Sequence, residues 1–139
     1  MKQHLIQGSD EWLEFRNGRI GASDAPIIMG VSPWSTPYEL WLHKMGLAYK
    51  PKTHWMQRGL DLEHDARELF ETTTGVFVLP EVVIHTQYYW MIASLDGMDV
   101  EKKVLVEIKC PGLADHECAK RGHVPTKSIP QLQHQMEVT

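Results

Sequence analysis

Apolar residues recur with the period of an α-helix between residues 58 and 74. This largely apolar stripe is formed by Leu62, Ala66, Leu69, Phe70 and Thr73. Gly75 follows the stripe, and glycine commonly ends helices because it adopts the left-handed conformation without strain. The pattern therefore predicts an amphipathic helix over 58–74. Glu63 shares a face with Ala66 and Phe70, so we expect its carboxylate at the inner edge of this helix.

Further helices are predicted by capping residues and by helix-ending glycines. Ser9 or Asp10 caps the first of them, and Ser23 caps a short second helix. Thr36, followed by a proline in the first turn, opens a third helix. The predicted ranges are 9–16, 24–29, 36–46 and 113–120, followed by a final segment over 131–139.

Runs of β-branched and aromatic residues after Gly75 predict a group of strands. These runs cover 76–79, 82–85, 89–95 and 104–109. In the last run the side chains alternate between two faces, so Glu107 and Lys109 share one face. The order of helices, then strands, then helices predicts an α/β fold with a short mixed β-sheet flanked by helices.

Composition narrows the classes of protein that this chain can represent. A chain of 139 residues fits a single domain. Its 14 Lys and Arg against 18 Asp and Glu make it acidic, whereas a domain that passively coats DNA is usually basic. No apolar segment approaches the roughly 20 residues of a membrane-spanning helix, and Cys110 and Cys118 form no disulfide or zinc pattern. We therefore expect a cytoplasmic protein without membrane contacts, and an acidic nuclease stays possible because a bound cation neutralises its carboxylates.

An aspartate and a Glu-x-Lys sequence follow one another on two predicted strands. Asp96 comes directly after the run 89–95, and Glu107 and Lys109 lie near the end of 104–109. Two carboxylates on adjacent strands make a hard-oxygen site suited to Mg²⁺ or Mn²⁺. Such an ion lowers the pKa of a bound water and offsets charge on a phosphate, and the lysine adds a second positive charge. This spacing indicates cleavage of phosphodiesters by a nuclease.

Each of these residues also has a purely structural interpretation. An Asp-Gly pair such as Asp96 and the following glycine is typical of tight turns. Glu107 and Lys109 could form a solvated strand face. Glu63 could pair with Arg67 on an exposed face of its helix, since the two are four residues apart.

Five short motifs occur along the chain in the order found in one nuclease family. They are Trp12-x-x-x-Arg16 followed by Ile20-Gly21-Ala22-Ser23, then Gly59-x-x-x-Glu63, Ser94-Leu95-Asp96-Gly97, Glu107-Ile108-Lys109-Cys110-Pro111 and Pro130-Gln131-Leu132-Gln133. With these motifs the chain resembles the phage lambda exonuclease and YqaJ-type viral recombinase nucleases, a branch of the PD-(D/E)xK superfamily. The resemblance runs from about Trp12 to the last residue, and it implies a restriction-endonuclease-like core.

The resemblance implies a metal site built from the acidic motifs. Asp96 and Glu107 would bind the metal, together with the carbonyl oxygen of Ile108. Glu63 would lie beside the metal and bind it directly or through water. Lys109 would position or polarise the attacking water.

The resemblance assigns the other candidates to the DNA. Gln133, and also Gln131, would hold the nucleophile or the scissile phosphate. Arg16 and Ser23 would grip the terminal 5′-phosphate, a bidentate task suited to a guanidinium. From the residues alone, the glutamines could be ordinary surface side chains, Arg16 could only offset a helix dipole, and Ser23 could only be an N-cap.

The activity implied by the resemblance is that of a Mg²⁺-dependent deoxyribonuclease, with Mn²⁺ as a substitute. It would digest one strand of duplex DNA in the 5′-to-3′ direction from 5′-phosphorylated ends, for phage-type recombination. A homotrimer, a cooperating single-strand annealing protein and a phage or prophage origin in a bacterial cytoplasm are implied as well. Two alternatives stay open: an endonuclease of the wider superfamily, and a catalytically weak remnant that binds DNA ends.

The sequence departs from the family pattern in two places. The family core has a further strand after the glutamine-bearing helix, whereas this chain stops at Thr139. We therefore expect one nuclease-like domain over 1–139 that is incomplete at its C-terminal end. The family has Ser-Pro-Asp-Gly where this chain has Leu95 before Asp96, and we expect the leucine to leave the aspartate in place.

Overall fold

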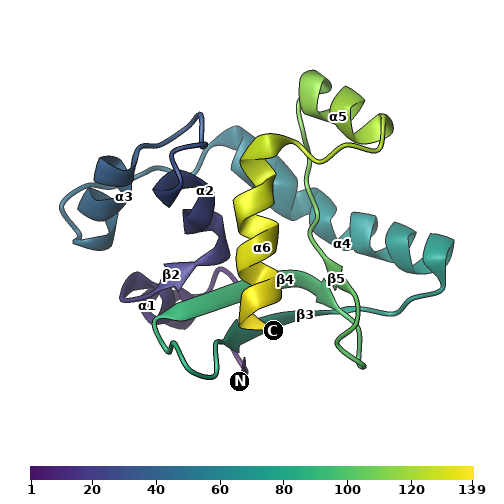
Figure 1. The fold of residues 1–139 in the computed structure, drawn as a ribbon, viewed down its shortest axis with the longest axis horizontal. Helices are drawn as coiled ribbons and strands as arrows, with labels where there is room; N and C mark the ends of the chain where they lie inside the picture. The colour runs from purple at the N-terminus through teal and green to yellow at the C-terminus, as the bar shows by residue number, and fades with distance from the viewer.

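The longest strand, β4 (Met91–Met98), is central to a five-stranded sheet in the computed structural model, which describes all 139 residues (Figure 1). β3 (Leu79–Ile84) pairs antiparallel along one edge of β4, and β1 (Lys2–Gln3) extends the sheet beyond β3. The other edge of β4 is shared between β2 (Ile20–Gly21), which pairs parallel with its first residues, and β5 (Leu105–Val106), which pairs antiparallel with its last residues. The predicted short mixed sheet is therefore confirmed.

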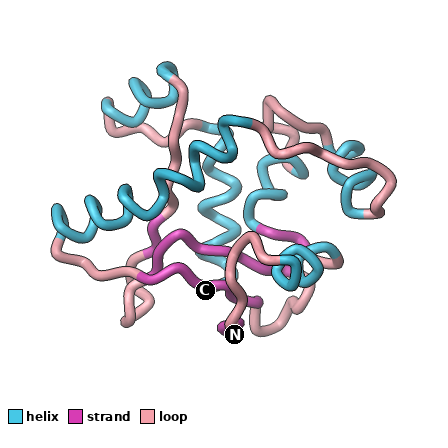
Figure 2. Tube along the Cα trace, turned by 180° about the vertical axis from the view of Figure 1, so that it is seen from behind, coloured by secondary structure: helices cyan, strands magenta, loops and turns pink.

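Helices from both halves of the chain flank this sheet. They are α1 (Asp10–Asn17), α2 (Ala25–Ile28), α3 (Pro37–Lys44), α4 (His54–Thr74), α5 (Leu113–Lys120) and α6 (Ile129–Val138), with 3₁₀ turns at Ala22–Asp24 and Thr126–Ser128. α6 lies in front of α4 in Figure 1, and Figure 2 shows α4 in front from the opposite side. None of the helices has both the length and the apolar character needed to cross a membrane.

The hydrophobic core lies where α6 and the N-terminal segment meet the two long strands. Its buried members are Ala22, Val83, Ala93, Leu95, Met98 and Val138. α6 is also attached by a buried polar contact, since His134 Nε2 lies 2.9 Å from the carbonyl oxygen of Ile92. Burial lowers the pKa of His134, so this contact is made by the neutral ring at neutral pH.

The helix predicted over 58–74 is confirmed, but it begins earlier, at His54. Thr53 starts it, because the Thr53 hydroxyl accepts a hydrogen bond from the Met56 N–H at 3.2 Å and so caps the first turn. Gly75 ends the helix with a φ of 73°, as its position after the stripe predicted. None of the residues of α4 is fully buried, so the apolar stripe is only partly covered.

The predicted strand boundaries need correction. One strand, β3, replaces the two predicted at 76–79 and 82–85, and residues 76–78 and 85 lie outside it. Its register is irregular between Leu79 and Glu81, where a proline lacks the N–H needed for regular pairing. The strand predicted over 89–95 begins at Met91 and continues to Met98. The strands β1 and β2 have two residues each, which is too short for any pattern in the sequence to predict them.

The strand predicted over 104–109 is regular only at Leu105 and Val106. The reason lies in one hydrogen bond: the N–H of Ile108 donates to the Asp96 side chain, at 2.8 Å from Oδ2, and not to a strand carbonyl. The backbone hydrogen bonds between β4 and β5 therefore end after Val106, and the Asp96 carboxylate takes the place of the next backbone acceptor.

Gly97 provides a test of how tightly this region is packed. A Cβ at position 97 would lie 2.7 Å from Val78 Cγ2 and 3.3 Å from Val106 Cβ. We expect Gly97→Ala to lower the free energy of unfolding by about 1–3 kcal/mol, because the added methyl overpacks the sheet. Urea denaturation measures this change.

Gly59→Ala is the matched control for this substitution. Gly59 lies inside α4, and beyond its own stretch of helix no atom lies within 4 Å of the place that an added methyl would take, so alanine there should stabilise the protein by about 0.5–1 kcal/mol. Equal stability of Gly97→Ala and the wild type would contradict the packing described here.

Candidate active site

The pairing of β4 with β5 brings the two acidic motifs together. Gly97 lies opposite Val106 in this ladder, so Asp96 and Glu107, the next residues outward, are neighbours. Asp96 Oδ2 accepts the N–H of Ile108 at 2.8 Å. The expected convergence of the two carboxylates on adjacent segments is therefore present in the structure.

The turn between these strands is built by a different aspartate. β4 continues through Asp96 and Gly97, so the interpretation of this pair as a tight turn is wrong. Asp99 has that task, because its Oδ1 accepts the N–H groups of Lys103 and Val104 at 2.7 and 2.8 Å. Asp96 is thereby left free of a turn-forming role.

Glu107 is surrounded by donors. Its Oε1 contacts Lys109 Nζ at 2.5 Å and Gln131 Nε2 at 2.6 Å, and its Oε2 accepts from Gln135 Nε2 at 2.5 Å. Lys109 Nζ also donates to Gln131 Oε1 at 3.0 Å. Only 9% of the Glu107 side chain is exposed, so the interpretation of Glu107 and Lys109 as a solvated strand face is wrong for the glutamate.

The glutamines that reach the site are not all those expected. Gln131 and Gln135 are one helical turn apart on α6 and therefore share the face that meets Glu107. Gln133 lies between them on the opposite face, with an exposed side chain that donates to none of the acidic residues. The structure thus brings Gln135, which is 2% exposed, to Glu107 and leaves Gln133 away from it. The i,i+4 spacing of Gln131 and Gln135 is the sequence signal that could have identified Gln135.

Glu63 approaches the pair from the helix α4. It forms the predicted i,i+4 ion pair with Arg67, at 2.5 Å between Oε1 and Nη2. The pair is largely covered, with 24% of the Glu63 side chain and 13% of the Arg67 side chain exposed, so its expected place on an exposed face is wrong. Arg67 also donates through Nε to the carbonyl oxygen of Asp96 at 2.7 Å.

The three carboxylates are compensated unequally. Arg67 offsets Glu63, and Lys109 with two amides offsets Glu107. Asp96 accepts only a backbone N–H. Burial, followed by the charge of Glu107, raises the pKa of Asp96 to about 7, and the Ile108 N–H and Lys109 oppose this only in part. The Asp96 carboxyl is therefore the one of the three that has no cationic side chain bonded to it.

The donor set at Asp96 and Glu107 fits a hard divalent cation. No three His, Cys, Asp or Glu side chains form a complete metal-binding group. Mg²⁺ is commonly held by one or two carboxylates, with water and substrate phosphate as its other ligands. Asp96, Glu107 and the Ile108 carbonyl would hold such an ion, and Glu63, which Arg67 bonds, lies close enough for its charge to act on Asp96.

The two residues expected at a 5′-phosphate, Arg16 and Ser23, also lie together. Arg16 Nη2 is 3.0 Å from Ser23 Oγ, and its guanidinium lies 4.6 Å from the centre of the Trp12 ring. Trp12 Nε1 in turn donates to Ser94 Oγ at 2.9 Å. Ser94 lies two residues before Asp96 on β4, so one strand supports both the phosphate-binding candidates and the acidic pair.

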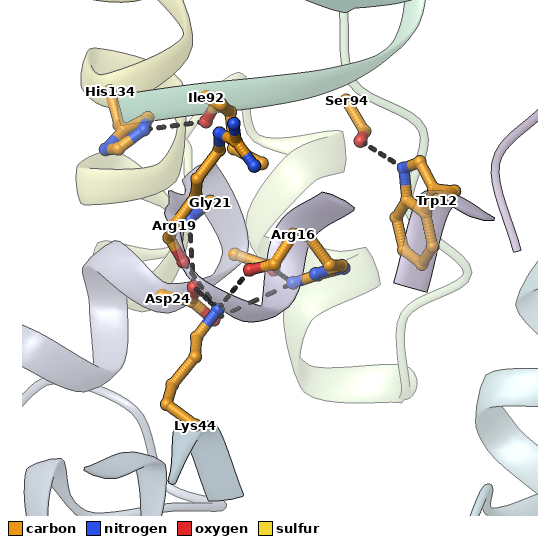
Figure 3. A network of polar contacts seen from close by, with 10 residues as sticks. Trp12, Arg16, Arg19, Gly21, Asp24, Lys44, Ile92, Ser94 and His134 are labelled. Atoms are coloured by element: carbon orange, nitrogen blue, oxygen red, sulfur yellow. Dashed lines mark hydrogen bonds and ion pairs between the residues drawn. The ribbon is translucent and has the colours of Figure 1, made fainter. Parts of the chain in front are cut away.

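A buried ion pair fixes this N-terminal motif. Asp24, 4% exposed, accepts the N–H of Gly21 at 2.9 Å and pairs with Lys44 Nζ at 2.8 Å (Figure 3). Lys44 also donates to the carbonyl oxygens of Arg16 and Arg19, at 3.2 and 2.8 Å. The ammonium of α3 thus binds one carbonyl in the last turn of α1 and one in the segment after it, and its ion pair with Asp24 holds both to the Ser23 turn. The sequence did not predict this pair, because its partners are far apart in the chain.

Three comparisons place these features among known proteins. Residues 11–139 match the sequence profile described as the YqaJ-like viral recombinase domain. The chain is 34% identical over 133 residues to the uncharacterized protein YqaJ of Bacillus subtilis (strain 168), a match that covers 93% of this chain and 42% of that protein. The chain therefore spans less than half the length of this relative.

The fold is similar to that of a crystallised nuclease. An alkaline exonuclease (LHK-Exo) from Laribacter hongkongensis superimposes with a TM-score of 0.77 at 29% identity, over 94% of this chain and 69% of that chain. The structure of LHK-Exo in complex with dAMP gives a TM-score of 0.75 at 30% identity, over 94% of this chain and 68% of that chain. The restriction-endonuclease-like architecture expected from the motifs agrees with this similarity.

The uncompensated carboxyl of Asp96 gives the metal-free protein a specific pH dependence. The pKa of Asp96 is about 7 in the folded protein and about 3.9 in an unfolded chain. Between these values the folded state holds a proton that the unfolded state has lost, so this group lowers the free energy of unfolding as pH rises. Asp96→Asn removes the effect. We expect its stability relative to the wild type in EDTA to rise between about pH 4 and about pH 7 and then to level off.

Thermal unfolding of both proteins in EDTA at several pH values measures this difference. The comparison cancels the titration of groups that do not interact with Asp96. A stability difference that is the same at every pH would show that Asp96 is not held in an unfavourable charged state.

Proposed function

The chain belongs to the YqaJ-like viral recombinase domain family, and from this membership we propose that it is a metal-dependent deoxyribonuclease. It acts on duplex DNA, which it digests 5′ to 3′ from 5′-phosphorylated ends, with Mg²⁺ as the cation and Mn²⁺ as a substitute. The single observation that carries the proposal is the convergence of Asp96, Glu107 and Lys109 where β5 ends, with negative charge in excess.

Each residue of the cluster has a task in this proposal. Asp96, Glu107 and the Ile108 carbonyl hold the cation. A divalent cation held there offsets charge on the scissile phosphate and lowers the pKa of a coordinated water. Lys109, half exposed and bonded to Glu107, orients the attacking water or polarises it. Gln131 and Gln135 restrain the Glu107 carboxylate, so its ligand oxygens stay in place without reorganisation.

The N-terminal motif supplies specificity for the end of the strand. Arg16 presents a guanidinium, and Ser23 adds a hydroxyl beside it. A terminal phosphate carries more charge than an internal one and accepts several hydrogen bonds, which suits this pair. The Asp24–Lys44 brace pre-organises both groups, so less entropy is lost when the phosphate binds.

The name of the structural relative supports exonuclease action over the alternatives. LHK-Exo is called an alkaline exonuclease, and it has been crystallised with dAMP. An endonuclease of the wider superfamily has no need for groups dedicated to a terminal phosphate, which is the task proposed here for Arg16 and Ser23. The homotrimer, the single-strand annealing partner and the phage-type recombination role are further parts of the proposal, and they rest on the family membership.

Loss of either cation ligand should remove the activity. We expect Asp96→Ala and Glu107→Ala to slow the Mg²⁺-dependent shortening of linear 5′-phosphorylated duplex by more than about 100-fold, since even supporting residues of metal sites cost about 10–100-fold. Gel analysis of end-labelled duplex measures the rate, and circular dichroism checks the fold. Closed circular DNA should stay uncut by the wild type.

Glu101→Ala is the matched acidic control, since Glu101 is exposed and pairs only with Lys103. It should digest duplex at the wild-type rate. Retained digestion by both site variants would refute the assignment, cleavage of circular DNA would favour an endonuclease, and end binding without any product would favour the inactive remnant.

Arg16→Ala should reduce the preference for phosphorylated ends. Hydrogen bonds to charged groups contribute about 1.5–3 kcal/mol, so we expect the rate ratio between 5′-phosphate and 5′-hydroxyl duplexes to fall by about 10-fold or more. Arg19→Ala is the control, because the Arg19 guanidinium lies over Phe15 and away from Ser23. An unchanged ratio in Arg16→Ala would remove Arg16 from the phosphate site.

A further inference from the structure

Arg67 makes two contacts that join the helix α4 to the acidic strand. Its Nε donates to the carbonyl oxygen of Asp96 at 2.7 Å, and its Nη2 contacts Glu63 Oε1 at 2.5 Å. Only 13% of its side chain is exposed. One guanidinium therefore binds the backbone of β4 and a carboxylate of α4 at the same time.

The helix α4 has few other attachments near the cluster. None of its 21 residues is fully buried, so apolar burial fixes its position less firmly than that of a core helix. A second polar link lies one turn further along, where Glu71 Oε1 accepts the N–H of Val78 at 2.9 Å. That link anchors the helix without touching Glu63. Arg67 is thus the residue that couples the helix position to the direction of the Glu63 carboxylate.

The form of this contact suits an arginine. The guanidinium is planar, and its N–H groups diverge at fixed angles, so fixing one on the Asp96 carbonyl also fixes the direction of the other. Without it, the Glu63 side chain would regain rotamer freedom and an unopposed charge close to Asp96. Arg67 bonds the backbone carbonyl of Asp96, and the carboxyl of this same residue is one of the proposed cation ligands. Arg67 therefore ties Glu63 directly to a residue of the cation site.

We propose that Arg67 is a positioning residue, which holds Glu63 beside Asp96 and Glu107 so that Glu63 contributes to cation binding there. The inference rests on the proposed function, because it requires a divalent cation at that pair. Arg67 acts through Glu63 and the Asp96 peptide, the two groups that its side chain contacts.

Mn²⁺ binding without DNA tests this role in a double-mutant cycle. Free Mn²⁺ is followed by electron paramagnetic resonance in the wild type, Glu63→Gln, Arg67→Gln and the double variant. We expect Arg67→Gln to weaken Mn²⁺ binding by about 10-fold or more. Added to Glu63→Gln, it should change binding less than twofold, because the residue through which it acts is already altered. The Mg²⁺ concentration for half-maximal digestion should rise in parallel.

Two further variants separate positioning from stability. Glu71→Gln breaks the other polar link of α4, so it should lower the urea midpoint while Mn²⁺ affinity stays at the wild-type value. Arg67→Lys keeps the charge without the planar fork, and it should fold while still binding Mn²⁺ more weakly than the wild type. It carries the test if Arg67→Gln fails to fold.

The outcomes distinguish this inference from the function on which it rests. Three results would overturn the positioning role alone. The Arg67 variants could bind Mn²⁺ with wild-type affinity, Arg67→Gln could weaken Mn²⁺ binding equally with Glu63 and with Gln at position 63, or Glu71→Gln could lose as much Mn²⁺ affinity as Arg67→Gln. A wild-type protein that neither binds Mn²⁺ nor digests duplex would overturn both.

Discussion

The pairing of β5 with β4 is the interaction on which the rest of the site depends. It places Asp96 beside Glu107, and the Asp96 carboxylate replaces a backbone carbonyl as the acceptor for Ile108. Holding carboxylates close together in a partly buried place costs free energy unless positive charge is near. The protein supplies that charge for Glu63 and Glu107 through Arg67 and Lys109. The Asp96 carboxyl has no such cationic partner, so we expect a bound cation to stabilise this carboxyl most.

The same strand organises the second half of the site. Ser94 accepts the Trp12 indole N–H on β4, and Trp12 stacks under Arg16. The Asp24–Lys44 pair, itself buried and hydrogen-bonded to three backbone groups, keeps the Arg16 and Ser23 segment rigid. The strand β4 therefore supports both the Arg16–Ser23 pair and the acidic pair of Asp96 and Glu107. In the proposed function, this common support would fix the distance between the end of the DNA strand and the bond that is cleaved.

Local patterns in the sequence predicted a large part of this arrangement. Period-two alternation correctly brought Glu107 and Lys109 together, and the helical stripe correctly turned Glu63 inward. The errors come from information that local patterns lack. Gln133 was chosen from a motif without its helix register, which instead turns Gln131 and Gln135 to the site.

Other features escaped prediction because their partners are distant in the chain. Arg67 was expected only to pair along its helix, since the Asp96 carbonyl is 29 residues away. The Lys44 contacts with α1 and the two-residue strands β1 and β2 likewise depend on tertiary contacts.

Anomalous scattering from crystals soaked in Mn²⁺ tests the central claim most directly. The account predicts a peak between the Asp96 and Glu107 carboxylates, and a peak elsewhere, or none, would contradict it.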